Sequence, residues 1–275
     1  MPPIYSPSRL ACFENCPKQF HYRYVLKVPA ESESVEAFVG KRVHEVLERL
    51  HLFVGRGLVP SLERVLDRFR RIWQEAYDRE RVRIVREETD EAFYVDLGER
   101  CLRQFYLRNY PFDADETLGL EQRVSCELDA ARGYRVRGII DRLVRARDGA
   151  IEIHDYKTSR RVPSQRQLDA DRQLALYQLA VAEVHPQTPI RLVWHYLLFG
   201  ATRVSTRSEE QLAELRRATS GLIERIEGEE RFEPRPGPLC AWCEYRERCP
   251  AGGARREAPA PGVPADAPGP QMQLL

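Results

Sequence analysis

The sequence predicts an α/β fold in which a mixed central sheet is flanked by helices. Apolar residues recur at helical spacing from about residue 35 to residue 110. Short segments rich in branched and apolar residues follow at 118–128, 134–145 and 150–157. Helical spacing returns at 167–184, before an apolar segment at 190–199. Helical and strand-like periods that alternate in this way are typical of a sheet covered by helices.

The helical block at 35–110 is the longest in the chain. Its apolar stripe includes Val39, Val43, Val46, Leu50 and Phe53. The pattern is interrupted near residues 55–60, between Gly55 and Pro60. We interpret residues 55–117 as a helical insertion in a single domain that covers residues 1–250.

Two of the predicted strands form a hairpin. Residues 147–149 (RDG) suit a three-residue loop in which glycine takes the left-handed position. In that register Ala146 pairs with Ala150, and Asp141 lies directly opposite Asp155.

The last third of the chain supplies the remaining elements and a tail. Residues 190–199 are predicted to pair with 202–207 across a short turn. Ser208 and Gln211 form a capping box at the start of a helix with the apolar stripe Leu212, Leu215, Leu222 and Ile226. Residues 251–275 are mostly Pro, Ala and Gly, so a disordered tail is expected.

Composition narrows the class of protein. Lys and Arg number 43 against 42 Asp and Glu, so any site for a polyanion must be local. No apolar stretch reaches the roughly 20 residues of a membrane span, and the amino terminus has no signal-peptide pattern. These features predict a cytoplasmic protein, in which disulfides are not expected and clustered cysteines indicate either metal ligation or chance.

Asp141, Asp155 and Lys157 form a constellation with a specific chemistry. Carboxylates paired across a hairpin lie about 5 Å apart and repel each other unless a cation such as Mg²⁺ lies between them. Lys157 shares a strand face with Asp155, so it can orient or help to deprotonate a water and balance charge in the transition state. This predicts a phosphodiester-cleaving site. The alternative is a solvated strand end, with the carboxylates paired to Arg142 and Lys157.

Several segments together resemble the PD-(D/E)XK nuclease superfamily, in particular its RecB-like branch. The central segments are 138–142 (GIIDR), 155–158 (DYKT) and 173–177 (QLALY). The amino-terminal ones are 6–10 (SPSRL), 16–17 (CP), 20–24 (FHYRY) and 40–44 (GKRVH). The resemblance implies a restriction-endonuclease-like core and a DNA nuclease that depends on Mg²⁺ or Mn²⁺.

The resemblance also assigns residues. It implies that Asp141, Asp155, the carbonyl of Tyr156 and His44 bind the metal, and that Gln173 and Tyr177 contact the DNA strand. Without it, His44 would be interpreted as a core or surface histidine, and the other two as a boundary pair on one helix face. Glu121 is a weaker candidate, equally compatible with a solvated strand position.

Cys240, Cys243 and Cys249 lie within ten residues of one another and need a fourth ligand. The resemblance implies Cys16 and a [4Fe–4S] cluster that joins the two ends of the chain, with Cys12 as the fallback ligand. Four thiolates suit zinc as well. Zinc sites usually contain two closely spaced pairs, so the division into one and three favours iron and sulfur. Cys101 and Cys126 are expected to be buried free thiols.

The predicted function is an exonuclease on single-stranded DNA ends, in DNA repair or recombination. A close alternative is the CRISPR-associated relative that trims DNA before spacer capture. A non-catalytic DNA-binding subunit of a helicase–nuclease complex and an iron–sulfur electron carrier are the alternatives from other classes. The chain has no G-x-x-x-x-G-K-[ST] loop, so any helicase partner must be a separate protein. Phe20, Tyr22 and Tyr24 are expected either to stack on bases or to lie in the core.

Overall fold

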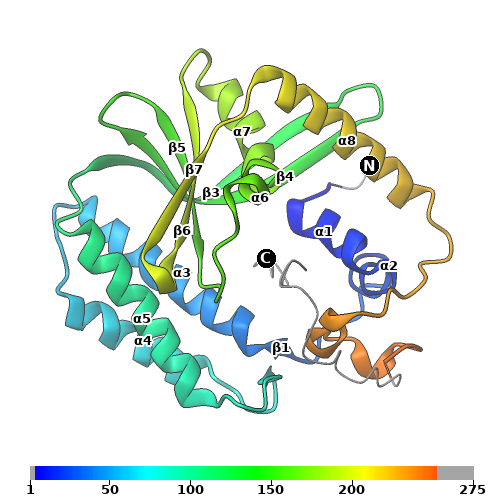
Figure 1. Cartoon of the computed structure of the whole chain (residues 1–275), viewed down its shortest axis with the longest axis horizontal. Coiled ribbons are helices and arrows are strands. Elements are labelled where there is room, and N and C mark those ends of the chain that lie inside the picture. The colour runs from blue at the N-terminus through cyan, green and yellow to red at the C-terminus, as the bar shows by residue number, and fades with distance from the viewer. Residues whose placement is uncertain (1–3, 253–275) are drawn as a thin grey trace.

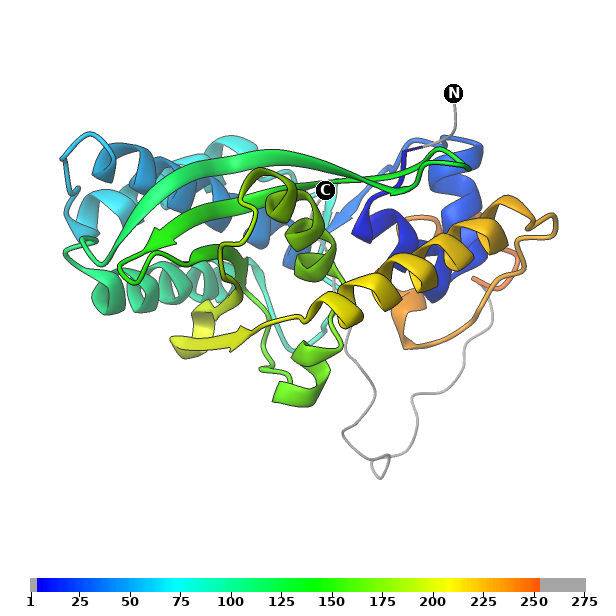
Figure 2. The same cartoon turned by 90° about the horizontal axis from the view of Figure 1, so that it is seen from above.

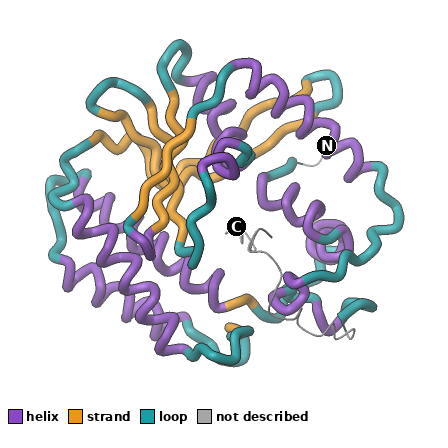
Figure 3. Tube along the Cα trace, viewed as in Figure 1, coloured by secondary structure: helices purple, strands orange, loops and turns teal. Residues whose placement is uncertain are grey.

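The computed structural model describes residues 4–252 and contains a mixed five-stranded sheet, in the order β3-β4-β5-β6-β7 (Figures 1 and 3). The strands are β3 (Asp115–Asp129), β4 (Tyr134–Ala146), β5 (Ile151–Lys157), β6 (Ile190–Tyr196) and β7 (Ala201–Ser205). β5 and β6 are parallel, and the other neighbours are antiparallel. The predicted α/β fold with a mixed sheet is confirmed.

Helices cover both faces of this sheet. One face carries α3 (Val35–Val54), α4 (Leu62–Ala76) and α5 (Glu91–Asn109), and the other carries α7 (Gln173–Val184) and α8 (Glu209–Glu227). A short α6 (Gln165–Asp169) precedes α7, and β1 (Glu33–Ser34) pairs in parallel with β2 (Val82–Arg83). The amino-terminal α1 (Pro7–Asn15), α2 (Pro17–Phe20) and π-helical turn His21–Val25 lie beside the carboxy-terminal 3₁₀ turns Pro238–Trp242 and Arg246–Arg248 (Figure 1).

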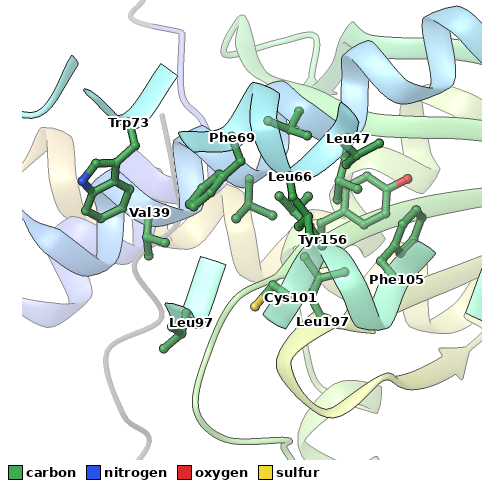
Figure 4. Close-up of a cluster of buried hydrophobic side chains, with 14 of the residues drawn as sticks. Val39, Leu47, Leu66, Phe69, Trp73, Leu97, Cys101, Phe105, Tyr156 and Leu197 are labelled. Carbon is green, nitrogen blue, oxygen red and sulfur yellow. The ribbon is translucent and has the colours of Figure 1, made fainter. Parts of the chain in front are cut away.

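The largest apolar core lies between the helices α3, α4 and α5 and the sheet (Figure 4). Helix residues such as Leu47, Phe69 and Cys101 are fully buried there and meet Tyr156 of β5 and Leu197 after β6. The side chain of Tyr156 therefore anchors the end of β5 to the helical layer. This fixes the backbone of the strand that carries Asp155 and Lys157.

The opposite face of the sheet packs against α7. Ile151, Ile153 and Trp194 contact this helix through one cluster, and a second cluster joins the far ends of β3 and β4 to α1 and α8. Because side chains alternate along a strand, β5 buries residues on both faces. A strand buried on both faces is held rigidly.

Several predicted elements are confirmed. The hairpin loop turns at Gly149 with φ +86°, and the amide N of Ala146 donates to the carbonyl of Ala150 at 2.9 Å. The helix α8 begins with the capping box formed by Ser208 and Gln211.

Three predicted boundaries are wrong. The helix expected at 167–184 is divided into α6 and α7, because the chain leaves helical geometry at Ala170 and restarts after Arg172. The strand expected at 190–199 ends at Tyr196 and continues as a 3₁₀ turn. The helical block at 35–110 has a second interruption between α4 and α5, where Val82 and Arg83 form β2 and Asp90 caps α5.

No helix within residues 4–252 is long and apolar enough to cross a membrane. The predicted disordered tail at 251–275 falls almost wholly outside the described residues.

Candidate active site

The site lies where β4 and β5 diverge. Their ladder runs from the Arg145–Ile151 pair to the Arg142–His154 pair, which is the register expected from the three-residue loop. Beyond this point the backbone N–H of Tyr156 donates to Oδ2 of Asp141 at 2.7 Å. A carboxylate thus takes the place of a backbone acceptor, and its other oxygen is free to face the site.

His44 reaches this point from α3. Its Nε2 lies 2.8 Å from the carbonyl oxygen of Tyr156, and its Nδ1 lies 3.5 Å from Oδ1 of Asp141. Glu121 of β3 completes a group in which one ligand atom each from His44, Glu121 and Asp141 lies within 4.8 Å of the others. The structure therefore brings together side chains from a helix and two strands.

The backbone of Glu121 has an unusual conformation. Its φ is +45°, in the left-handed region that residues other than glycine seldom adopt. The flanking pairs Gln122–Ile140 and Leu120–Arg142 keep an unbroken register on either side. This register puts Glu121 opposite Asp141, and the local kink lies at the candidate metal site.

Asp155 and Lys157 form a closed network with Gln173. Nζ of Lys157 lies 2.8 Å from Oδ2 of Asp155 and donates to Oε1 of Gln173 at 3.1 Å. Nε2 of Gln173 donates to Oδ1 of Asp155 at 3.1 Å. Gln173 is the first residue of α7, so the start of that helix orients both charged groups. Asp155 itself lies outside the group formed by His44, Glu121 and Asp141.

Burial and crowding of charge shift the acids and bases of the site. Burial raises the pKa of Asp155 to about 6, and the Asp141 charge adds to this while Lys157 opposes it. Burial and the Asp141 charge raise the pKa of Glu121 to about 7. Burial disfavours the imidazolium of His44, but Asp141 and Asp155 outweigh it and raise the pKa to about 9.

This donor set fits a hard divalent cation. Carboxylate oxygens and a backbone carbonyl are the ligands that Mg²⁺ and Mn²⁺ prefer, and a single imidazole is compatible with Mn²⁺. Burial is the main cause of the raised pKa values of Asp155 and Glu121, and the nearby Asp141 charge raises both further, so a bound cation would stabilise the charged forms of these carboxylates. In the metal-free chain, protonated His44 supplies part of the missing positive charge.

Tyr177 occupies a different position from Gln173, although they share one face of α7. It is only 6 % exposed and packs against Gly138, where an added Cβ would lie 2.0 Å from the ring. Glycine at 138 is thus required for the close approach of β4 to α7. This contact positions the strand that carries Asp141.

Two partners near the site were missed from the sequence. Asp171, just before α7, is half-buried, and its carboxylate accepts from the N–H of Gln173 at 3.0 Å. Arg142 pairs with Asp115 of β3 rather than with Asp141. The local sequence predicts neither contact. Asp171 lies in a segment that looks like a loop, and Asp115 lies 27 positions before its partner Arg142 along the chain.

The four candidate cysteine ligands line one pocket. Cys16, Cys240, Cys243 and Cys249 all border it, whereas Cys12 is buried in an apolar cluster outside it. Within residues 4–252, no three thiols approach within 4.8 Å of one another.

Backbone donors face two of these sulfurs. The N–H of Arg235 points to Sγ of Cys16 at 3.5 Å, and the N–H of Gly237 points to Sγ of Cys240 at 3.4 Å. Burial raises the pKa of Cys243 to about 12 in the metal-free chain. Without a cation nearby, this thiol therefore keeps its proton at neutral pH.

Polar contacts also join the two ends of the chain around this pocket. Glu244 forms an ion pair with Arg23 and accepts from Gln19 at 2.9 Å, and the hydroxyl of Tyr22 donates to the carbonyl of Arg248 at 3.0 Å. Phe20 is 1 % exposed, so it belongs to the core rather than to a stacking surface. Cys101 and Cys126 are buried in apolar surroundings, as expected.

Comparison with known proteins identifies the class. The sequence matches the PD-(D/E)XK nuclease superfamily over residues 4–250, and the chain belongs to this superfamily. Nucleases of this superfamily use divalent metals, in agreement with the acidic group at His44, Glu121 and Asp141.

None of the curated proteins matches the sequence. Among solved structures, "Crystal structure of SSO0001" is similar to this chain at 14% identity with a TM-score of 0.44, covering 92% of this chain and 88% of that one.

Proposed function

We propose that this chain is a deoxyribonuclease dependent on Mg²⁺ or Mn²⁺ that hydrolyses DNA from single-stranded ends. The observation that carries the proposal is the group of His44, Glu121 and Asp141 within 4.8 Å, next to the ion pair of Asp155 and Lys157. The superfamily supports nuclease chemistry, and the RecB-like segments support action at DNA ends in repair or recombination.

The residues would divide the work as follows. Asp141, Asp155, His44 and the Tyr156 carbonyl would hold the cation, with Glu121 as an additional carboxylate. When bound, the cation would polarise a phosphate oxygen and lower the pKa of a water. Lys157 would hold its proton near the developing negative charge on the phosphate.

Gln173 would keep Lys157 and Asp155 in position through its two hydrogen bonds at 3.1 Å. The ion pair with Asp155 and the hydrogen bond to Gln173 restrict the rotation of the Lys157 side chain, so its charge is positioned before the substrate binds. Tyr177 would contribute through its packing on Gly138, which places β4.

The test compares linear and circular single-stranded DNA with Mg²⁺ or Mn²⁺ present. Wild type should degrade the linear strand and spare the circle, and Asp155→Asn and Lys157→Met should degrade neither. The matched control is Asp96→Asn, which changes an exposed carboxylate on α5. Variants at 155 and 157 that match wild type would contradict the assignment of the site, and cleavage of circles would contradict the requirement for an end.

A specific observation bears on the close alternatives. A non-catalytic subunit has no need for the Asp155–Lys157 ion pair, in which Asp155 is buried with a raised pKa, a feature typical of functional sites. The CRISPR-associated nuclease shares the same residues, and DNA trimming that depends on a partner integrase would favour it.

We further propose that Cys16, Cys240, Cys243 and Cys249 bind a [4Fe–4S] cluster with a structural role. The four thiols line one pocket, and their division along the chain into one and three, rather than two close pairs, favours an iron–sulfur cluster over zinc. Backbone N–H groups directed at Cys16 and Cys240 support thiolates in the pocket.

Iron, sulfide and zinc analysis of protein purified without oxygen tests this second proposal. Four iron and four sulfide per chain, with a visible absorption band that a reductant bleaches, are expected. One zinc per chain without iron would show a zinc site instead. The same analysis of Cys101→Ala, a buried thiol away from the pocket, is the control.

A further inference from the structure

The hairpin of β3 and β4 extends far beyond β5 as a two-stranded ribbon (Figure 2). Along this extension, buried and exposed side chains alternate in both strands. One face is buried against α1, α7 and α8, and includes Cys126, Leu128, Tyr134 and Val136. The other face is exposed and consists of Arg123, Ser125, Glu127, Arg135, Arg137 and Ile139.

The exposed residues pair across the ribbon in a regular row. Arg123 is opposite Ile139, Ser125 opposite Arg137, and Glu127 opposite Arg135. We call Arg123, Arg135 and Arg137 the arginine row. Within the described part of the chain, none of the three forms an ion pair or a side-chain hydrogen bond. Glu127, the single carboxylate on this face, pairs with none of them either.

Exposed arginines without an ion pair also lie elsewhere in the described residues, but here three of them share one face of a single ribbon. The chain as a whole is nearly neutral, at +1, and many of its arginines are joined to carboxylates. The arginine row supplies three positive charges on one exposed face, with one negative charge among them. A local basic stripe in a neutral protein is a feature of sites for polyanions.

The row leads directly into the candidate active site. The register that pairs Arg123 with Ile139 puts Glu121 opposite Asp141 two residues further along the ribbon. At about 3.3 Å per residue, the six steps from Asp141 to Arg135 cover roughly 20 Å, enough for a few nucleotides of extended strand. Ile139, 39% exposed at the end nearest the site, offers an apolar contact for a base.

We propose that the arginine row binds the phosphates of a single DNA strand and guides it along the ribbon to the metal site. The inference rests on the proposed nuclease function and adds the path of the substrate. We commit to a single strand as the occupant because the proposed nuclease acts on single-stranded ends and because the exposed Ile139 offers an apolar surface to an unstacked base.

The test measures binding rather than cleavage. Anisotropy of a labelled single-stranded oligonucleotide is recorded over a range of salt without added divalent metal, for wild type and for R123Q/R135Q/R137Q. Loss of three phosphate contacts should weaken binding at least about tenfold at low salt and make the slope of log K against log salt shallower by about 2. A triple Arg→Lys variant should recover most of the binding, because charge is what the phosphates recognise.

The matched control replaces three other exposed arginines that lie outside the ribbon. Arg71, Arg103 and Arg225 are exposed, form no ion pair within the described residues, and lie on α4, α5 and α8. R71Q/R103Q/R225Q should bind as wild type does, and thermal unfolding should show both triple variants folded.

The proposed DNA path would be refuted if both triple variants lost the same amount of binding affinity, or if the arginine-row variant lost none. DNA cleavage by wild type would still support the proposed nuclease function in that case. If the arginine row bound duplex DNA as tightly as single-stranded DNA, the assignment of a single strand would be wrong. Failure of wild type to cleave any DNA would refute the proposed function itself.

Discussion

The active site and the cysteine pocket hold their side chains together by different means. At the active site, β4, β5 and α7 converge with hydrogen bonds already formed, such as that from the Tyr156 amide to Asp141 at 2.7 Å. At the cysteine pocket, four thiols within the described residues line a cavity without a hydrogen bond between them, and the two ends of the chain contact each other through interactions such as the Glu244–Arg23 ion pair. The first region is organised by the fold, whereas for the second we have proposed that a bound cluster completes it.

Different variants should therefore damage different properties. Changes to charged groups at the active site should reduce catalysis and spare stability, because neutral isosteres keep the hydrogen bonds. Changes at the cysteine pocket should reduce stability first and activity second, because closure of a long loop is lost.

Asp141→Asn is the largest effect we expect. An asparagine oxygen can still accept from the N–H of Tyr156, but the negative charge that faces His44 and the cation is lost. DNA cleavage should fall on the order of 10⁴-fold, comparable to loss of one charged member of a catalytic group. Single-turnover kinetics measure the fall, and an unchanged rate would remove Asp141 from the site.

Cys243→Ser should give the largest change in stability. Loss of the ligand should release the cluster and destabilise the chain by on the order of 4 to 5 kcal/mol on the loop-entropy account. Chemical unfolding measures the loss of stability, and iron analysis of the same protein measures the loss of the cluster. Cys101→Ala, in the helical core, should retain its iron. A Cys243→Ser protein as stable as wild type would show that the polar contacts alone join the ends.

Gln173→Ala should have an intermediate effect. Without the amide, Lys157 and Asp155 keep their ion pair but lose the two hydrogen bonds that orient it. We expect a 10- to 100-fold loss of activity, typical of partners that position metal ligands. Gln165→Ala, on the neighbouring short helix, is the control. A loss confined to KM for DNA would instead indicate a direct contact with the substrate.

The limits of sequence reasoning follow the same division between local and distant contacts. The hairpin register was predicted because Gly149 and its neighbours determine the turn locally. The α8 cap was predicted for the same reason, from Ser208 and Gln211.

Features that depend on distant contacts were not predictable in this way. The kink at Glu121 and the pairing of Arg142 with Asp115 depend on packing across the sheet, for which a single sequence has no local signal. The division of α6 from α7 was missed because helical spacing continues through it in the sequence. The roles proposed for His44 and Cys16 rest on family resemblance, since each residue lies far along the chain from its neighbours in space.

The smallest expected effect is a change of stability with pH. The folded-state pKa values of His44, Asp155 and Glu121 are raised to about 9, 6 and 7, so these three groups hold more protons in the metal-free folded chain than in the unfolded chain. Burial lowers the pKa values of His51 and His195, which act in the opposite direction. The contribution of the first three groups to stability is greatest at low pH and decreases as pH rises through their folded-state pKa values.

A bound cation should reverse this trend, because it requires the same groups without their protons. The rise in Tm that Mn²⁺ causes should therefore be larger at pH 8 than at pH 6, with about 2 to 4 °C for each kcal/mol. His44→Gln should weaken this pH dependence, while His185→Gln, after α7, should not. A stabilisation by Mn²⁺ that is equal at both pH values would mean that the cation binds elsewhere. The active site would then not be a preorganised metal site, and its contrast with the cysteine pocket would no longer hold.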